Sequence, residues 1–82
     1  MPEAFVLINT QIGGEHEVLR RILKIDEVDQ AYLVYGVYDI VAKVKAETME
    51  KLRDAITWKI RKMDKVMSTI TMIVIEGHRK GN

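Results

Sequence analysis

Apolar residues along the chain follow two different spacings. Four runs are apolar at most positions and have the length of a strand: 4–10, 28–35, 39–45 and 66–75. Elsewhere, at 18–23 and 49–63, apolar residues recur every three or four positions, which is the spacing of an amphipathic helix. The pattern therefore predicts the element order β-α-β-β-α-β.

The boundaries of these elements carry residues that start or stop regular structure. Gly13 and Gly14 interrupt the chain between the first strand and the first helix. Thr48 is expected to cap the second helix, because its hydroxyl can accept a hydrogen bond from a backbone N–H in the first turn. Gly36 separates the second and third strands, where a tight hairpin turn needs a residue with positive φ.

This order predicts a ferredoxin-like βαββαβ domain of the α+β class. Two split βαβ units with right-handed crossovers give a four-stranded antiparallel sheet with both helices on one face. The first and third strands should be the central ones, and both are strongly apolar.

Two helices can cover only one face of such a sheet, yet the strands are apolar on both. In the first strand Phe5 and Leu7 point to one side, and Val6 and Ile8 point to the other. The last strand repeats this alternation, with Ile70, Met72 and Val74 opposite Ile73 and Ile75.

A monomer would leave one of these apolar sets in water as a patch that spans several strands. We therefore expect a homodimer that packs sheet against sheet as a dimeric α/β barrel. A core of this size supplies only about 3–5 kcal/mol, so association would also stabilise the domain. The alternative is a monomer with a partly apolar surface.

Composition narrows the classes of function. The 82 residues include 13 Lys plus Arg and 12 Asp plus Glu, and a net charge of +1 disfavours direct nucleic-acid binding. The chain has no cysteine, and no apolar stretch is long enough to span a membrane. No signal peptide is visible, so we expect a cytoplasmic protein with no membrane partner. Many Ile, Lys and Glu residues suggest a thermophilic source.

Candidate chemistry centres on the stretch 32–41, where Asp39 stands as the turn enters the third strand. Its carboxylate can receive a cationic group, or it can fix the turn by accepting backbone N–H bonds. His16 and His78 lie outside the apolar elements and lack ligand spacing, so we expect no metal site and no cofactor. No nucleophile–base pair is apparent, so we expect no catalytic residue and a protein that is not an enzyme.

Residues 34–41, Val-Tyr-Gly-Val-Tyr-Asp-Ile-Val, resemble the G-x-Y-D turn of the Lrp/AsnC (leucine-responsive) transcriptional regulators. Residues 4–8 and 69–75 resemble the first and last strands of their C-terminal RAM domain. The resemblance covers residues 4–75, and it implies a RAM-like ligand-binding and oligomerisation domain at 1–76 followed by a polar tail at 77–82.

The resemblance also implies partners. Family domains dimerise through their sheets, and dimers commonly assemble into rings of eight. Small effectors, usually amino acids, bind near the G-x-Y-D turn where dimers meet. Family regulators carry a helix-turn-helix domain ahead of this one, and this chain begins at the first strand. We therefore expect a stand-alone module that binds no DNA itself and forms mixed oligomers with full-length Lrp/AsnC regulators.

An amino-acid effector is a zwitterion, so its ammonium needs a carboxylate and its carboxylate needs N–H or O–H donors. Asp39 can supply the first, and backbone N–H groups near Gly36 can supply the second. Each candidate also has a purely structural interpretation, as a turn brace, a conformational glycine or an ordinary strand residue. The predicted ligand-binding residues are Tyr35, Gly36, Val37, Tyr38, Asp39, Ser68, Thr69 and Thr71.

Three functions remain at this point. The first is an oligomeric module that binds an amino acid or related metabolite and modulates transcription through full-length regulators. The second is a small ferredoxin-like dimeric enzyme, since fold alone does not exclude catalysis. The third is an oligomerisation partner that binds no ligand.

Overall fold

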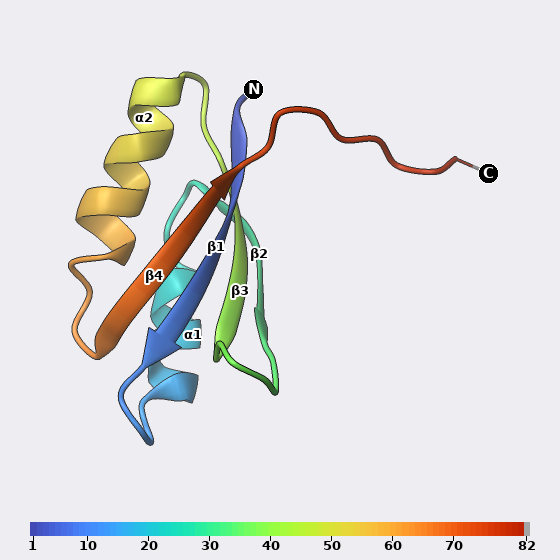
Figure 1. Cartoon of the computed structure of the whole chain (residues 1–82). Helices are drawn as coiled ribbons and strands as arrows, with labels where there is room; N and C mark the ends of the chain where they lie inside the picture. The colour runs from blue at the N-terminus through green and yellow to red at the C-terminus, as the bar shows by residue number, and fades with distance from the viewer. Residues whose placement is uncertain (82) are drawn as a thin grey trace.

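The computed structural model describes residues 1–81, so Asn82 of the predicted tail lies outside the described residues. Two helices lie on one side of a four-stranded sheet (Figure 1). The elements are β1 (Glu3–Thr10), α1 (Glu15–Ile22), β2 (Val28–Leu33), β3 (Ile40–Lys45), α2 (Met49–Asp54) continued by η1 (Ala55–Ile60), and β4 (Val66–Ile73).

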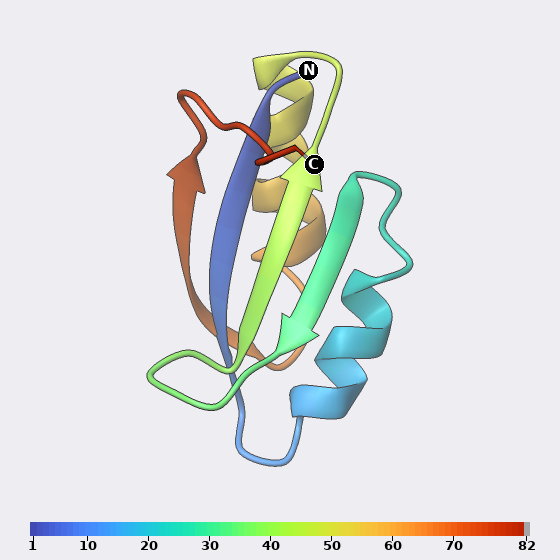
Figure 2. The ribbon, with the colours of Figure 1, turned by 90° about the vertical axis from the view of Figure 1, so that its right-hand side faces the viewer.

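The sheet has the order β2-β3-β1-β4 and is antiparallel throughout (Figure 2). The first and third strands are therefore central, as predicted. Val6 of β1 lies opposite Ala42 of β3 on one side and Thr71 of β4 on the other. This topology confirms the predicted ferredoxin-like βαββαβ fold.

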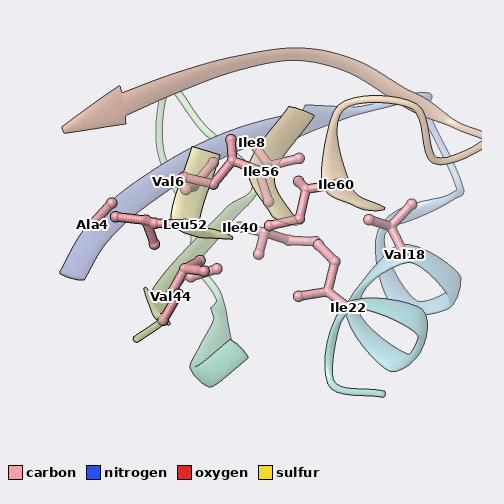
Figure 3. Packing of buried hydrophobic residues seen from close by; sticks show 12 residues of the cluster. Ala4, Val6, Ile8, Val18, Ile22, Ile40, Val44, Leu52, Ile56 and Ile60 are labelled. Carbon is pink, nitrogen blue, oxygen red and sulfur yellow. The ribbon is translucent and has the colours of Figure 1, made fainter. Parts of the chain in front are cut away.

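The core fills the space between the sheet and the helices (Figure 3). Alternate residues of the central strands point into it, because side chains in a strand alternate between the two faces. Thr48 caps α2 as predicted, since its Oγ1 accepts a hydrogen bond from the Lys51 N–H at 3.1 Å. The largest fully buried side chains are Val6, Ile8, Val18, Ile22, Ile40, Val44, Leu52 and Ile60.

The other side of the sheet has no element over it among the described residues (Figure 2). The strand register places the second set of alternating residues there, since Phe5 lies opposite both Lys43 and Met72. We call this side the open face; its apolar members are Phe5, Leu7, Tyr32, Val41, Ile70 and Met72. Ile70 is 46% exposed and Met72 47%, so the predicted uncovered apolar face is present in the single chain.

The connection between β2 and β3 differs from the sequence-based expectation. In place of the predicted tight turn, the structure has a six-residue loop, Val34–Asp39. The Val34 N–H donates to the Asp39 carbonyl at 2.8 Å and closes this loop. Gly36 does not have positive φ; the glycine that does is Gly13, with φ 86°. The prediction for Gly36 was wrong because a loop of this length can reverse the chain without a left-handed residue at that point.

The second helix also departs from a regular α-helix. Its last part, η1, is π-helical, and the Arg61 N–H donates to the carbonyl of Ile56, five residues back, at 2.9 Å. The predicted apolar stripe is nevertheless buried at Leu52, Ile56 and Ile60.

The chain after β4 leaves the body of the domain on the side of the open face (Figures 1 and 2). Val74, the first residue after β4, is still bonded to β1, because its N–H donates to the Glu3 carbonyl at 2.9 Å. Across residues 1–81, none of the helices is long and apolar enough to cross a membrane.

Candidate functional site

Asp39 fastens the loop between β2 and β3 to the end of β1. Its Oδ2 accepts a hydrogen bond from the Thr10 N–H at 2.9 Å and lies 3.3 Å from the Thr10 hydroxyl. The Asp39 N–H in turn donates to the carbonyl of Ile8 at 3.0 Å. Thr10 is only 8% exposed, so the carboxylate satisfies an N–H that water would reach poorly. Asp39 therefore bonds a backbone N–H, but on a neighbouring strand and not in its own turn.

A hollow of about 340 Å³ adjoins this loop. The end of β2, the loop and the first turn of α1 line it, through Leu33, Val34, Tyr35, Gly36, Asp39, Glu15 and His16. Two carboxylates and one imidazole thus border a space large enough for a small metabolite. This charge pattern suits a ligand that carries an ammonium group.

The loop residues predicted to bind ligand are brought together, although few of them are buried. Tyr35 and Val37 are exposed at the tip of the loop, and Tyr38 is partly buried near its base. No heavy atom outside the neighbouring residues lies within 4 Å of the point where a Cβ on Gly36 would stand. The backbone at Gly36 is therefore open to approach from outside the domain.

The three hydroxyl residues predicted on the last strand do not join this cluster in the single chain. Ser68 lies opposite Asn9 on the open side of the sheet, whereas Thr69 and Thr71 lie opposite Ile8 and Val6 and point to the helix side. Moreover, β1 lies between β4 and β3, so it separates these residues from Asp39. Ser68 and Thr69 line a different hollow, beside Arg61.

Sequence reasoning missed Glu15 and His16 as residues that line the hollow beside the loop. His16 was considered only as a metal ligand, and Glu15 was not singled out as a binding residue. The fold sets the N-terminal end of α1 beside the C-terminal end of β2, because α1 crosses back over the sheet before β2 begins. The signal available in the sequence was that both residues follow a break at Gly13–Gly14, on the turn that leaves β1.

Lys65 makes further hydrogen bonds between two segments at the same end of the domain. Its carbonyl accepts from the Gln11 N–H at 2.9 Å, and its Nζ donates to Glu17 Oε1 at 2.8 Å. That hydrogen bond lowers the pKa of the Glu17 carboxyl from its ordinary value. Lys65 also has φ 74°, which is uncommon for a residue with a side chain. The turn before β4 is thus held against the turn after β1.

Residues 3–82 match the family described as the Lrp/AsnC ligand binding domain. This chain belongs to the Lrp/AsnC family. The match confirms the resemblance found at the G-x-Y-D turn, and it extends over nearly the whole chain.

Relatives of this Lrp/AsnC chain include the HTH-type transcriptional regulator FL11 of Pyrococcus furiosus. FL11 is 31% identical over 77 residues, which are 94% of this chain and 50% of FL11. The chain therefore spans about half the length of the curated relatives it matches.

Solved structures match over the full domain. The crystal structure of FFRP-DM1 is 47% identical with a TM-score of 0.88, covering 92% of this chain and all of that chain. The protein PHS023 from Pyrococcus horikoshii is 46% identical with a TM-score of 0.87, over 95% of this chain and 94% of that chain. A feast or famine regulatory protein from M. tuberculosis, complexed with L-methionine, is 25% identical with a TM-score of 0.81, over 98% of this chain and 54% of that chain.

Proposed function

We propose that this chain is an oligomeric effector-binding module that takes an amino acid or a related small metabolite beside the loop Val34–Asp39. The observation that carries the proposal is the position of Asp39. Both of its contacts to Thr10 use Oδ2, so Oδ1 is the oxygen we assign to the effector's ammonium group. Glu15 and His16 border the same hollow and supply further charge for a zwitterion.

The relatives support this choice over catalysis. FL11 is named as a transcriptional regulator, and the M. tuberculosis relative was solved with L-methionine, an amino acid. We infer that the effector of this chain belongs to the same chemical class. Ser68, Thr69 and Thr71 enter the proposal as residues of a neighbouring subunit, because the single chain holds them apart from Asp39.

We further propose that the open face forms the dimer interface, and that dimers assemble into a ring of eight. The six apolar residues of the open face lie together across four strands, which is the arrangement that a sheet-to-sheet dimer buries. The same face would let this chain form mixed oligomers with full-length Lrp/AsnC regulators and act on transcription through them. With a net charge of +1, the chain is proposed to bind no DNA itself.

Thermal unfolding against each of the twenty amino acids tests the effector site. An effector at 100 times its dissociation constant stabilises the folded state by about 2.7 kcal/mol, which shifts the midpoint of a domain this small by about 10 °C or more. The informative variant is Asp39→Asn, because the amide oxygen can still accept from the Thr10 N–H while the charge is lost. Asp64→Asn makes the same charge change outside the hollow and serves as the control.

The proposal requires that one or a few amino acids raise the midpoint of the wild type and of Asp64→Asn but not of Asp39→Asn. A shift of equal size in all three proteins would remove Asp39 from the site. If no amino acid or related metabolite shifts the wild type, the chain is better described as an oligomerisation partner without a ligand.

The interface is tested by light scattering on two matched variants. Ile70→Lys places a charge among the apolar residues of the open face, next to Leu7 of the central strand β1, and is expected to yield a monomer. Leu23→Lys makes a similar change at an exposed residue of 52% accessibility at the end of α1, and should keep the wild-type mass. Equal masses for both variants would show that the open face is not the interface.

A further inference from the structure

Residues 74–81 follow β4 as an extended segment outside the helices and strands, and we call this segment the arm. Val74 is still bonded to Glu3 of β1, so the arm begins at the end of the sheet. The chain bends at Ile75 and then leaves the plane of the sheet, away from the helices and on the side of the open face (Figures 1 and 2). Every residue from 75 to 81 is exposed.

Ile75 is the one large apolar residue in this exposed stretch, and its side chain is 99% exposed. A single exposed isoleucine is ordinary, and Ile12, in the turn after β1, is as exposed at 102%. The position distinguishes the two residues. Ile12 lies at the opposite end of β1, whereas Ile75 follows Val74, which borders the same hollow as Phe5 of the open face.

This hollow has a volume of about 450 Å³ and separates the arm from the open face of its own chain. The sheet borders it through Glu3, Phe5 and Lys43, and the arm borders it through Gly77, His78 and Arg79. Within residues 1–81, the arm makes one side-chain hydrogen bond, and that bond joins Glu76 to His78 at 2.9 Å inside the arm itself. The arm therefore stands away from its own sheet and leaves space there for the side chains of another chain.

The reach of the arm can be compared with the thickness of a sheet-to-sheet dimer. Packed sheets lie about 10 Å apart, and an extended chain advances about 3.3 Å per residue. In the dimer proposed above, Ile75 would therefore lie in the layer between the two sheets. The whole arm spans up to about 26 Å, so its later residues would pass beyond that layer and lie beside the sheet of the second copy.

We propose that the arm of each chain packs on a second copy of this chain, with Ile75 buried among the apolar residues of the partner's open face. The inference rests on the proposed sheet-to-sheet dimer and adds a second set of contacts to it. A twofold axis repeats every contact, so each dimer has two such arms. Because both arms must be released before the chains separate, they slow the exchange of subunits by which mixed oligomers with full-length regulators would form.

The two exposed isoleucines provide matched variants of the full chain, Ile75→Ser and Ile12→Ser. Both side chains are exposed in the single chain, so neither change disturbs its core. Burial of one isoleucine is equivalent to about a tenfold change in a dissociation constant, and the two arms together to about a hundredfold change. Such changes act mostly on the rate of dissociation. We expect Ile75→Ser to exchange subunits about a hundredfold faster than the wild type, and Ile12→Ser to exchange as the wild type does.

Native mass spectrometry measures this rate, as the time that ordinary and isotope-labelled chains take to appear in the same dimer. The chain has no cysteine, so Ile75→Cys places a photo-crosslinker at one defined position. In a mixture of ordinary and labelled chains, we expect the crosslink to join the arm of one chain to the open face of another. Equal exchange rates for the wild type and Ile75→Ser overturn the inference, and so does a crosslink formed within one chain, which would show that the arm lies on its own sheet.

Failure of this inference can be distinguished from failure of the proposed dimer. If Ile70→Lys yields a monomer while Ile75→Ser exchanges as slowly as the wild type, the sheet interface stands and the arm has no part in it. If Ile70→Lys keeps the wild-type mass, the sheet-to-sheet dimer is wrong and the assignment of the arm is wrong with it.

Discussion

Removal of the Asp39 carboxylate should destabilise the domain even where no ligand is present. In Asp39→Ala, the Thr10 N–H loses its acceptor at 2.9 Å while remaining at a residue that is 8% exposed. An N–H left unpaired at such a site lowers the free energy of unfolding by about 2 kcal/mol. For a domain of this size, that change lowers the thermal midpoint by about 10 °C. Circular dichroism melts at one fixed protein concentration measure it, because association also contributes to stability.

Two further variants divide this effect between its parts. Asp39→Asn keeps an oxygen acceptor for the Thr10 N–H, so we expect its loss of stability to be less than half of the loss in Asp39→Ala. Thr10→Val keeps the backbone N–H and removes the hydroxyl, which lies 3.3 Å from Asp39 Oδ2 and 3.1 Å from the Gln11 carbonyl oxygen, and it should lower the midpoint by no more than a few degrees. If Asp39→Ala melts within about 2 °C of the wild type, or Asp39→Asn melts as low as Asp39→Ala, the bond to Thr10 does not have the role assigned here.

Three other predictions concern stability. Lys65→Gly should be more stable than Lys65→Ala by about 1 kcal/mol in urea unfolding, because φ 74° is strained only when a side chain is present; equal stabilities would contradict this. Leu52→Ala should lose about 3 kcal/mol by leaving a cavity under the second helix, whereas Leu23→Ala, at a half-exposed site, should change stability by less than about 0.5 kcal/mol. The hydrogen bond from Lys59 lowers the pKa of the Glu27 carboxyl in the folded state. The Glu27–Lys59 pair therefore stabilises the fold fully at a pH above the ordinary glutamate pKa of 4.5, and this stabilisation is lost as the pH falls through the lowered pKa of the folded state. The difference in midpoint between the wild type and Glu27→Gln should therefore be present at pH 7 and disappear in acid, and a constant difference would argue against the pair.

The strands and their order could be predicted because the apolar periodicity is local and strong. Phe5 and Val6 alternate between two faces in β1, and this alternation alone predicted that one apolar face of the sheet would be left uncovered; that Val6 faces the core and Phe5 the open side came from the structure. The cap at Thr48 could be predicted for the same reason, since it depends on residues within one turn of helix. The central position of β1 and β3 followed from chain topology and required no knowledge of side-chain contacts.

The conformation of the loop Val34–Asp39 could not be predicted from the residues of the loop alone. Gly36 was expected at positive φ, but the loop is held at its base by Asp39, whose carboxylate reaches a residue 29 positions earlier in the chain. No turn rule includes a contact of that range. Ser68 and Thr69 are a different case, because their opposite faces follow from the period of a strand and could have been read from the sequence.

A hollow of about 530 Å³ beside Trp58, at the opposite end of β3 from the loop Val34–Asp39, could not have been found from the sequence. Leu52, Ile56 and Ile60 fit a regular amphipathic helix, so the pattern carries no sign of the π-helical segment between Ala55 and Ile60. The walls of the hollow also come from four parts of the chain that lie apart in the sequence: Met1, 26–27, 45–47 and 51–59. Only the assembled fold brings them to one place.

The order of the strands in the sheet also determines how the domain can fold during its synthesis. The segment β1-α1-β2-β3 contains three of the four strands and can pair them as soon as residue 45 has left the ribosome. Until β4 follows, one edge of β1 lacks its partner, and that edge belongs to the apolar run Ala4–Ile8, which later pairs with Thr69–Ile73. An uncovered apolar edge recruits strands from other chains. Translation that stalls between residues 45 and 66 would therefore release a nascent chain that aggregates through its first strand, whereas a completed chain covers that edge with its own last strand.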